Sequence, residues 1–226
     1  MKSIVLLSGG LDSVVCLKKA HDETSVELAL TFDYGHRAAL REIDCSRKIC
    51  RRFKVPHRSI RLDWLKQITK TSLVNRKRKI PEPEKGDLDK NPADTVRDVW
   101  VPNRNGVFLN TAASFAEARG VELIVAGFNA EEAAAFPDNS LQFVESVNRS
   151  LQYSTLSHPK VISYTQSLSK KETVELGIGI GAPLDLIWSC YRGGERMCGK
   201  CESCVRAKRA FEESGHFDII EERFSN

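Results

Sequence analysis

Short apolar runs alternate along the chain with segments that have helical periodicity. The runs are rich in Val, Ile and Leu and have the length of buried strands; they span residues 4–7, 27–32, 59–62, 122–126 and 160–163. Between them, apolar residues recur on one face of predicted helices, in the sets Leu40, Ile43 and Cys50, then Phe108, Ala112 and Phe115, then Phe143, Val147 and Leu151. This alternation predicts an α/β fold with an open, mainly parallel sheet and helices on both faces.

Three loops of the predicted sheet carry unusual residues. Ligands of open parallel sheets bind beyond the carboxyl ends of the strands. The loops that follow Leu7, Phe32 and Ala126 are therefore the candidate positions for chemistry.

The length of 226 residues suits one domain, because single cores stop growing near ~250 residues. We therefore predict a single domain at 1–226. Residues 66–105 have little apolar periodicity, a basic run at 76–79 and four prolines, which predicts a mobile insertion or lid. The basic run is typical of a solvated loop, with contact to a polyanion as the alternative.

Composition narrows the class of protein. The chain is 41% hydrophobic and 28% charged, and no stretch approaches the ~20 apolar residues of a membrane span. The run at 4–7 is too short for a signal peptide and leads into glycines. A net charge of +4 permits an anionic substrate such as a nucleotide but does not indicate a nucleic-acid binder. We expect a cytoplasmic protein without membrane association.

The first predicted strand leads into a glycine-rich loop, Ser8-Gly9-Gly10-Leu11-Asp12-Ser13. Paired glycines leave backbone N–H groups free to converge on an anion at the positive end of the following helix. Ser8 and Ser13 add hydroxyl donors, and Asp12 either caps the helix or holds a Mg²⁺ ion that accompanies phosphates. The loop lacks the ending of a Walker loop and the spacing of the dinucleotide fingerprint. A plain tight turn is the alternative for the glycine pair alone.

Four cysteines cluster near the C-terminus, in the pattern Cys-X7-Cys-Gly-Lys-Cys-Glu-Ser-Cys formed by Cys190, Cys198, Cys201 and Cys204. Two-residue gaps let neighbouring thiolates chelate one ion, which predicts a closed, structural Zn²⁺ site within a C-terminal region at 186–226. An iron–sulfur cluster is the alternative cofactor. The remaining cysteines, Cys16, Cys45 and Cys50, fall at helical positions and are predicted to be core thiols.

The form Ser-Gly-Gly-X-Asp-Ser resembles the PP-loop of the ATP pyrophosphatase family. Members cut ATP between the α and β phosphates, attach AMP to a carboxylate or carbonyl oxygen and release pyrophosphate. The segments FDYGHR at 32–37, VPNRN at 101–105 and WSCYRGG at 188–194, with this loop and the cysteines, resemble the 7-cyano-7-deazaguanine synthase family over nearly the whole chain. That resemblance implies an adenine nucleotide alpha hydrolase-like fold.

The same resemblance implies an activity. Family members are AMP-producing, nitrile-forming carbon–nitrogen ligases. They convert 7-carboxy-7-deazaguanine into the nitrile with ammonia and two ATP, through an adenylate, an amide and a second adenylate. The product is a precursor of queuosine and archaeosine.

The resemblance also assigns roles to particular residues. The catalytic residues implied are Asp12, Ser13, Arg104 and Lys170. The nucleotide-binding residues implied are Leu7, Ser8, Gly9, Gly10, Leu11, Asp12, Ser13, Asp33, Tyr34 and Gly35. The substrate-binding residues implied are Asn105, Gly127, Asn129, Glu132 and Asp138. Lys170 would neutralise charge as pyrophosphate departs.

One segment departs from the family pattern. Where the family usually reads Gly-Val-Asn-Ala-X-Asp-Tyr-Ser-Gly-Tyr-Pro-Asp-Cys, this chain has GFNAEEAAAFPDN at 127–139. Glu132 would replace the acid, but Ala133 replaces an aromatic residue and Asn139 a cysteine. A Gln of the family also appears as His36. These changes bear on the identity of the substrate rather than on adenylation.

Two other functions are compatible with the sequence. The first is a related PP-loop enzyme that amidates or thiolates another carboxylate or an RNA base. The second is a zinc-containing nucleic-acid-binding module, which should show a broad basic face and aromatic platforms, whereas aromatic residues form only 8% of this chain. The expected partners are a small-molecule carboxylate and ammonia, with the ammonia source and a homodimer left open.

Overall fold

A five-stranded parallel sheet forms the centre of the protein. The computed structural model describes residues 1–88 and 92–225. The strand order across the sheet is β3-β2-β1-β4-β5, and every neighbouring pair is parallel. The predicted open, parallel α/β architecture is therefore confirmed. The strands are β1 (Lys2–Leu6), β2 (Ser25–Asp33), β3 (His57–Arg61), β4 (Leu123–Val125) and β5 (Lys160–Ile162).

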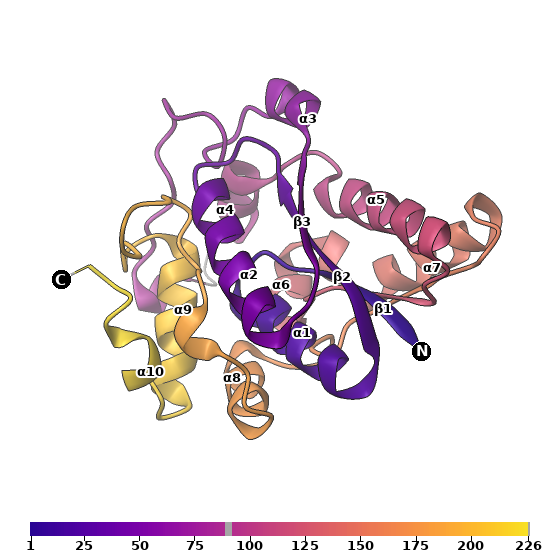
Figure 1. Ribbon diagram of the computed structural model, residues 1–226. Coiled ribbons are helices and arrows are strands. Elements are labelled where there is room, and N and C mark those ends of the chain that lie inside the picture. The colour runs from indigo at the N-terminus through magenta and orange to yellow at the C-terminus, as the bar shows by residue number, and fades with distance from the viewer. Residues whose placement is uncertain (89–91, 226) are drawn as a thin grey trace.

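Helices connect the strands and cover both faces of the sheet (Figure 1). The described α-helices are α1 (Leu11–Glu23), α2 (Ala39–Phe53), α3 (Asp63–Ile68), α4 (Pro92–Val99), α5 (Arg104–Arg119), α6 (Ala130–Ala135), α7 (Leu141–Ser154), α8 (Lys170–Gly179), α9 (Glu202–Glu213) and α10 (Asp218–Glu221). Three single-turn 3₁₀ helices are η1 (Lys85–Asp87), η2 (Pro137–Asn139) and η3 (Leu184–Leu186). None of the helices in the described part is both long and apolar enough to cross a membrane.

Each face of the sheet has its own hydrophobic core. On one face, α1, α2, α8 and α9 contribute fully buried residues such as Val14, Ile49 and Phe211. On the other face, α5 and α7 contribute Leu109 and Leu151. The central strands β1, β2 and β4 are largely buried, which explains why they read as apolar runs rather than as alternating patterns.

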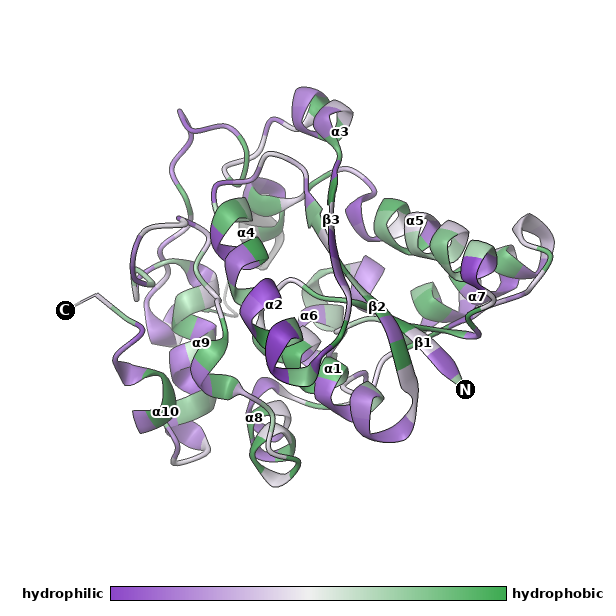
Figure 2. Cartoon of the chain, in the orientation of Figure 1, coloured by the Kyte–Doolittle hydropathy of each residue, from purple (hydrophilic) through white to green (hydrophobic). Residues whose placement is uncertain are grey.

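The helical periodicity is confirmed in α5 and α7 but was misread at the start of α2. Leu40 is 80% exposed, so the predicted arc through Leu40 is wrong. The buried face of α2 instead begins at Ala39 and continues through Cys45 and Ile49. Leu40 is the residue after Ala39, and the rotation of about 100° between successive helix residues turns its side chain away from the buried face. Figure 2 shows hydrophilic residues predominating on the outer surface of α2.

The segment at 66–105 contains the end of α3, then η1 and α4; its residues 89–91 lie outside the described part of the chain. Apolar residues along it, among them Leu73, Ile80 and Leu88, are buried against the body of the protein. The basic run at 76–79 is exposed, as predicted for a solvated loop. The mobility of this segment stays a prediction.

Candidate active site and metal centre

The strand order creates a crevice at the carboxyl end of the sheet. The chain builds β1, β2 and β3 toward one edge and then adds β4 and β5 toward the other, so the direction of winding changes between β1 and β4. Loops on either side of such a switch point diverge and leave room for a ligand. The loops after β1 and β4 are the glycine-rich loop and the segment that begins at Gly127.

The glycine-rich loop connects β1 directly to the N-terminus of α1. Gly9 has φ +78°, in the left-handed region that favours glycine. Gly10 is the N-cap residue of α1, and no side chain caps this helix, so the interpretation of Asp12 as a cap is wrong. Ser13 Oγ donates to Gly10 O at 3.0 Å and accepts from Ser8 N at 3.3 Å. The N–H groups at the start of α1 are therefore available to bind an anion.

Asp12 lies in a buried ion-pair network with residues from two distant helices. Lys170 Nζ, from the first residue of α8, donates to Asp12 Oδ2 at 2.5 Å and to Glu132 Oε1 at 2.6 Å. Burial alone would lower the pKa of Lys170, but attraction to the two carboxylates outweighs it and raises that pKa. Lys170 conversely lowers the pKa of Glu132, against the effect of burial. The site therefore holds a charged ammonium beside the glycine-rich loop.

The loop after β4 fixes this network in place. Asn129 is the N-cap of α6 and accepts from Glu132 N at 2.9 Å. The amide of the same residue donates to Asp12 Oδ1 at 3.1 Å, so one side chain joins α6 to α1. Glu131 accepts from the backbone N–H of Lys170 at 2.8 Å. Asn129 and Glu131 thus position the three charged groups without contacting the cavity themselves.

A second cationic centre lies at the N-terminus of α5. Arg104 Nη1 lies 3.5 Å from Tyr34 Oη, and Arg104 Nε donates to Asn105 Oδ1 at 3.3 Å. Asn105 in turn donates to the backbone carbonyl of Asp138 at 3.1 Å. Burial opposes the charge on Arg104, but Tyr34 and Asp138 raise its pKa overall. The guanidinium is therefore held charged by groups from two other segments of the chain.

These groups surround one cavity of about 260 Å³. The predicted site residues on its wall are Leu7, Ser8, Gly10, Leu11, Asp12, Ser13, Tyr34, Arg104, Asn105, Gly127, Glu132 and Lys170. Asp138 lines a smaller pocket of about 60 Å³ that shares Arg104 and Glu132 with the main cavity. Gly9, Asp33, Gly35 and Asn129 are not on the wall, and they act instead through turn geometry or through hydrogen bonds to residues that are.

Several wall residues were not among the predicted site residues. Tyr191 donates to Glu202 Oε2 at 2.9 Å, and Arg206 forms an ion pair with the same carboxylate. Glu202 is only 3% exposed, and all three residues line the cavity. In the sequence, only position distinguishes two of these residues: Tyr191 follows Cys190, and Glu202 lies between two predicted metal ligands. His36, which stands where the family has Gln, also lines the cavity.

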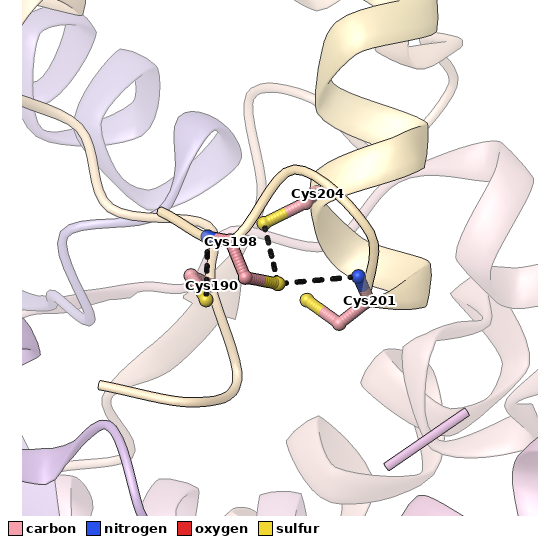
Figure 3. Close-up of side chains that lie close together, drawn as sticks. All are labelled: Cys190, Cys198, Cys201 and Cys204. Carbon is pink, nitrogen blue, oxygen red and sulfur yellow. Dashed lines mark hydrogen bonds between the residues drawn. The ribbon is translucent and has the colours of Figure 1, made fainter. Parts of the chain in front are cut away.

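The four clustered cysteines lie together at the start of α9 (Figure 3). Their sulfur atoms are all within 4.8 Å of one another, and Cys198 Sγ and Cys204 Sγ are 3.9 Å apart. Zn–S bonds of ~2.3 Å in a tetrahedron require sulfur separations of about 3.8 Å, so this arrangement fits one zinc ion. Backbone N–H groups of Arg192 and Cys198 also point at Cys190 Sγ, each at 3.4 Å, as suits a thiolate. An iron–sulfur cluster distributes its thiolates over several iron atoms and needs a wider spacing.

Cys16, Cys45 and Cys50 are buried in the core next to the sheet. Burial raises the pKa of all three thiols, that of Cys50 to about 12. Because metals bind the thiolate, these residues are poor ligands. The prediction of core thiols is confirmed.

Gly127 gives a direct test of how tightly the loops are packed. A Cβ atom at this position would lie 2.6 Å from Ser13 N, a backbone atom. We expect Gly127→Ala to displace the start of α1, weaken ATP binding at least ~10-fold and destabilise the fold by about 1–3 kcal/mol. Calorimetric titration with ATP and denaturant unfolding measure the two effects. Gly179→Ala is the control, because nothing lies within 4 Å of that Cβ; equal behaviour of the two variants would contradict close packing at Gly127.

Comparisons with known proteins agree over nearly the whole chain. A model of the family described as "Queuosine biosynthesis protein QueC" matches residues 2–215. A protein of Pelotomaculum thermopropionicum named 7-cyano-7-deazaguanine synthase is 54% identical over 217 residues, covering 95% of this chain and 98% of its own. One of the same name from Methanosarcina mazei is 49% identical over 228 residues, covering 99% of each chain.

A solved structure shares the fold. The crystal structure of a 4-thiouridine synthetase–RNA complex with bound ATP aligns with a TM-score of 0.50 and 18% identity, over 98% of this chain and 52% of the other.

Proposed function

This chain belongs to the family of queuosine biosynthesis protein QueC, and on that premise we propose that it makes 7-cyano-7-deazaguanine from 7-carboxy-7-deazaguanine and ammonia at the expense of ATP. The observation that supports this best is the buried Lys170, held between Asp12 and Glu132 beside the phosphate loop. A cation there faces the anions that an adenylation reaction produces. Arg104 provides a second cation on the same cavity wall.

ATP would bind with its phosphates over the N-terminus of α1. Ser8 and Ser13 offer hydroxyl groups there, and the backbone of Gly10 and Leu11 lines the same wall. Lys170 would then stabilise the charge that develops on the leaving pyrophosphate, since preorganised charge is worth most in a water-poor site. Arg104 would hold the carboxylate of the substrate against the α-phosphate.

The chemistry explains why ATP is needed twice. A carboxylate is a poor electrophile, and transfer of AMP to its oxygen creates a good leaving group. Ammonia then attacks the carbonyl carbon, AMP leaves, and a proton from nitrogen is released, giving the amide. A second transfer of AMP to the amide oxygen releases pyrophosphate, and loss of AMP with that oxygen and of both protons from the nitrogen then gives the nitrile. The enzyme contributes positioning and charge stabilisation.

We also propose that Mg²⁺ accompanies the phosphates. Both oxygens of Asp12 are engaged, Oδ1 by Asn129 and Oδ2 by Lys170. Each of these oxygens keeps a second lone pair that can bind the ion, and Glu132 uses only one oxygen for Lys170. The proposed cellular location is the cytoplasm, where clustered thiolates stay reduced for zinc.

The substrate ring would lie near Asn105, Glu132 and the altered segment at 127–139. Asn139, which stands where the family usually has cysteine, is buried and lines the cavity. Because Asn139 is on the cavity wall, its replacement of the usual cysteine bears on which ring the cavity accepts. Glu132 can accept hydrogen bonds from a purine-like N–H edge through the oxygen that Lys170 leaves available.

Product analysis tests the proposal. We expect the zinc-loaded protein to release AMP and pyrophosphate only when 7-carboxy-7-deazaguanine is present, and mass spectrometry to show the primary amide followed by the nitrile as ammonia is supplied. Omission of ammonia should leave the adenylate as the end point. Accumulation of the amide alone, or turnover with a different carboxylate and none with this one, would replace the nitrile assignment by that of a related amidating enzyme.

A further inference from the structure

His36 is a buried polar side chain whose hydrogen-bonding groups are unused. It lies in the loop that follows β2, is 7% exposed and lines the main cavity. Neither ring nitrogen has a hydrogen-bond partner among the described residues. The ring is held in place by stacking on Tyr34, with centroids 4.1 Å apart and planes 17° apart. An oriented, buried donor and acceptor without partners indicates that a ligand supplies them.

Glu42, on the first turn of α2, lies beside this ring. Its Oε2 is 3.0 Å from His36 Nε2, but the contact does not have hydrogen-bond geometry. Glu42 also lines the cavity, and its backbone carbonyl is next to Gly9 of the phosphate loop. The pair therefore presents a donor and an anionic acceptor side by side, close to the loop where phosphates would bind.

The chemistry of this pair limits what it can bind. A carboxylate repels phosphate oxygens, so the triphosphate itself is a poor match. Two adjacent hydroxyl groups are a good match, because each can donate to Glu42 or accept from His36. Leu30 and Phe32 of β2 add apolar wall to the same cavity, as suits the nucleoside part of a nucleotide. Carboxylates near the end of the second strand bind ribose hydroxyls in other nucleotide-binding α/β folds.

We propose that His36 and Glu42 bind the ribose 2′- and 3′-hydroxyls of ATP and so determine the preference for ribonucleotides over deoxyribonucleotides. This inference rests on the proposed use of ATP and adds the recognition of its sugar. Tyr34 has a different part in it: its ring orients His36, while its hydroxyl lies against Arg104. The nucleoside side and the reacting side of the cavity would thus meet at Tyr34.

The test compares binding of ATP, 2′-deoxy-ATP and 3′-deoxy-ATP to the zinc-loaded protein by calorimetry, without the carboxylate substrate. We expect the wild type to bind ATP about 10–100-fold more tightly than either deoxynucleotide. Glu42→Ala, and His36→Phe, which keeps a ring against Tyr34, should reduce that ratio to about threefold or less. His36→Gln retains a donor and an acceptor and should keep most of the preference. Asp44→Ala is the control, since Asp44 pairs with Lys48 at the surface of the same helix.

The ratio separates recognition from a structural effect. Loss of packing would weaken all three nucleotides equally and leave the ratio intact, which would overturn the inference. A wild type that binds ATP and deoxy-ATP equally would overturn it as well. Failure of the proposed reaction gives a different result, because a protein that binds ATP but makes no product from 7-carboxy-7-deazaguanine still yields these ratios.

Discussion

Replacing Lys170 by methionine is expected to lower the rate of AMP formation by about a thousandfold, because the charge beside the leaving pyrophosphate is lost. Methionine keeps much of the length and the apolar stem, so the change is chiefly one of charge. Pyrophosphate exchange into ATP, measured with saturating carboxylate, reports this step directly. Lys171→Met is the matched control: Lys171 is the next residue on α8, half-exposed and paired with Glu175 at the surface. Full activity of Lys170→Met would remove Lys170 from the mechanism.

The same substitution should also destabilise the fold in a pH-dependent way. Asp12 and Glu132 would lose their shared counter-ion, and breaking a buried pair costs about 3–5 kcal/mol. In the wild type the pKa of Glu132 is lowered from 4.5, so its pairing stabilises the protein above that pH and the contribution is lost as the pH falls. The difference in unfolding free energy between wild type and variant should therefore be largest near pH 7 and shrink toward pH 4. Lys170→Arg restores the charge, so recovered stability with impaired catalysis would separate the two effects.

Replacing Cys201 by serine is expected to remove the metal and much of the stability together. Cys201 is fully buried, and structural zinc contributes on the order of 10 kcal/mol of binding free energy in small zinc modules. We expect metal content to fall from one zinc per chain to a small fraction, and the unfolding free energy to fall by at least about 3 kcal/mol. Elemental analysis and denaturant unfolding measure the two quantities on the same samples.

Cys50→Ala is the control for loss of a buried thiol. Cys50 lies in the same core, but its pKa of about 12 keeps it protonated, so this variant should retain its zinc. A brown protein that contains iron and labile sulfide, or a Cys201 variant with its zinc intact, would show that the four-thiolate zinc centre is wrong.

Local sequence patterns predicted the parts of this protein that depend on near neighbours. The strand at 4–7 and the glycines that follow it predict a strand, loop and helix, which the structure forms as β1 and α1. The spacing of Cys198, Cys201 and Cys204 predicts one turn that brings thiolates together, and the sulfur atoms do converge. In both cases the residues that make the feature lie within a few positions of one another.

The rest depends on contacts between distant segments. The sequence places Lys170 near the reaction only through family resemblance, since its partners Asp12 and Glu132 come from other helices. The position of Glu202 between two predicted metal ligands does not by itself indicate a role in the cavity, which becomes evident only from its hydrogen bond with Tyr191. The prediction for Leu40 was wrong for a different reason. Helical periodicity gives the spacing of the buried residues but not which residue begins the buried face.

The location of α9 has a consequence for maturation of the enzyme. Cys201, its N-cap residue, and Cys204 in its first turn belong to the four clustered cysteines, and Glu202 and Arg206 of the same helix line the cavity. We therefore expect a newly synthesised chain to complete its cavity only when these thiolates bind zinc. We expect cells starved of zinc to accumulate full-length but inactive protein. The supply of zinc, rather than the level of expression, would then limit the flux through this biosynthetic step.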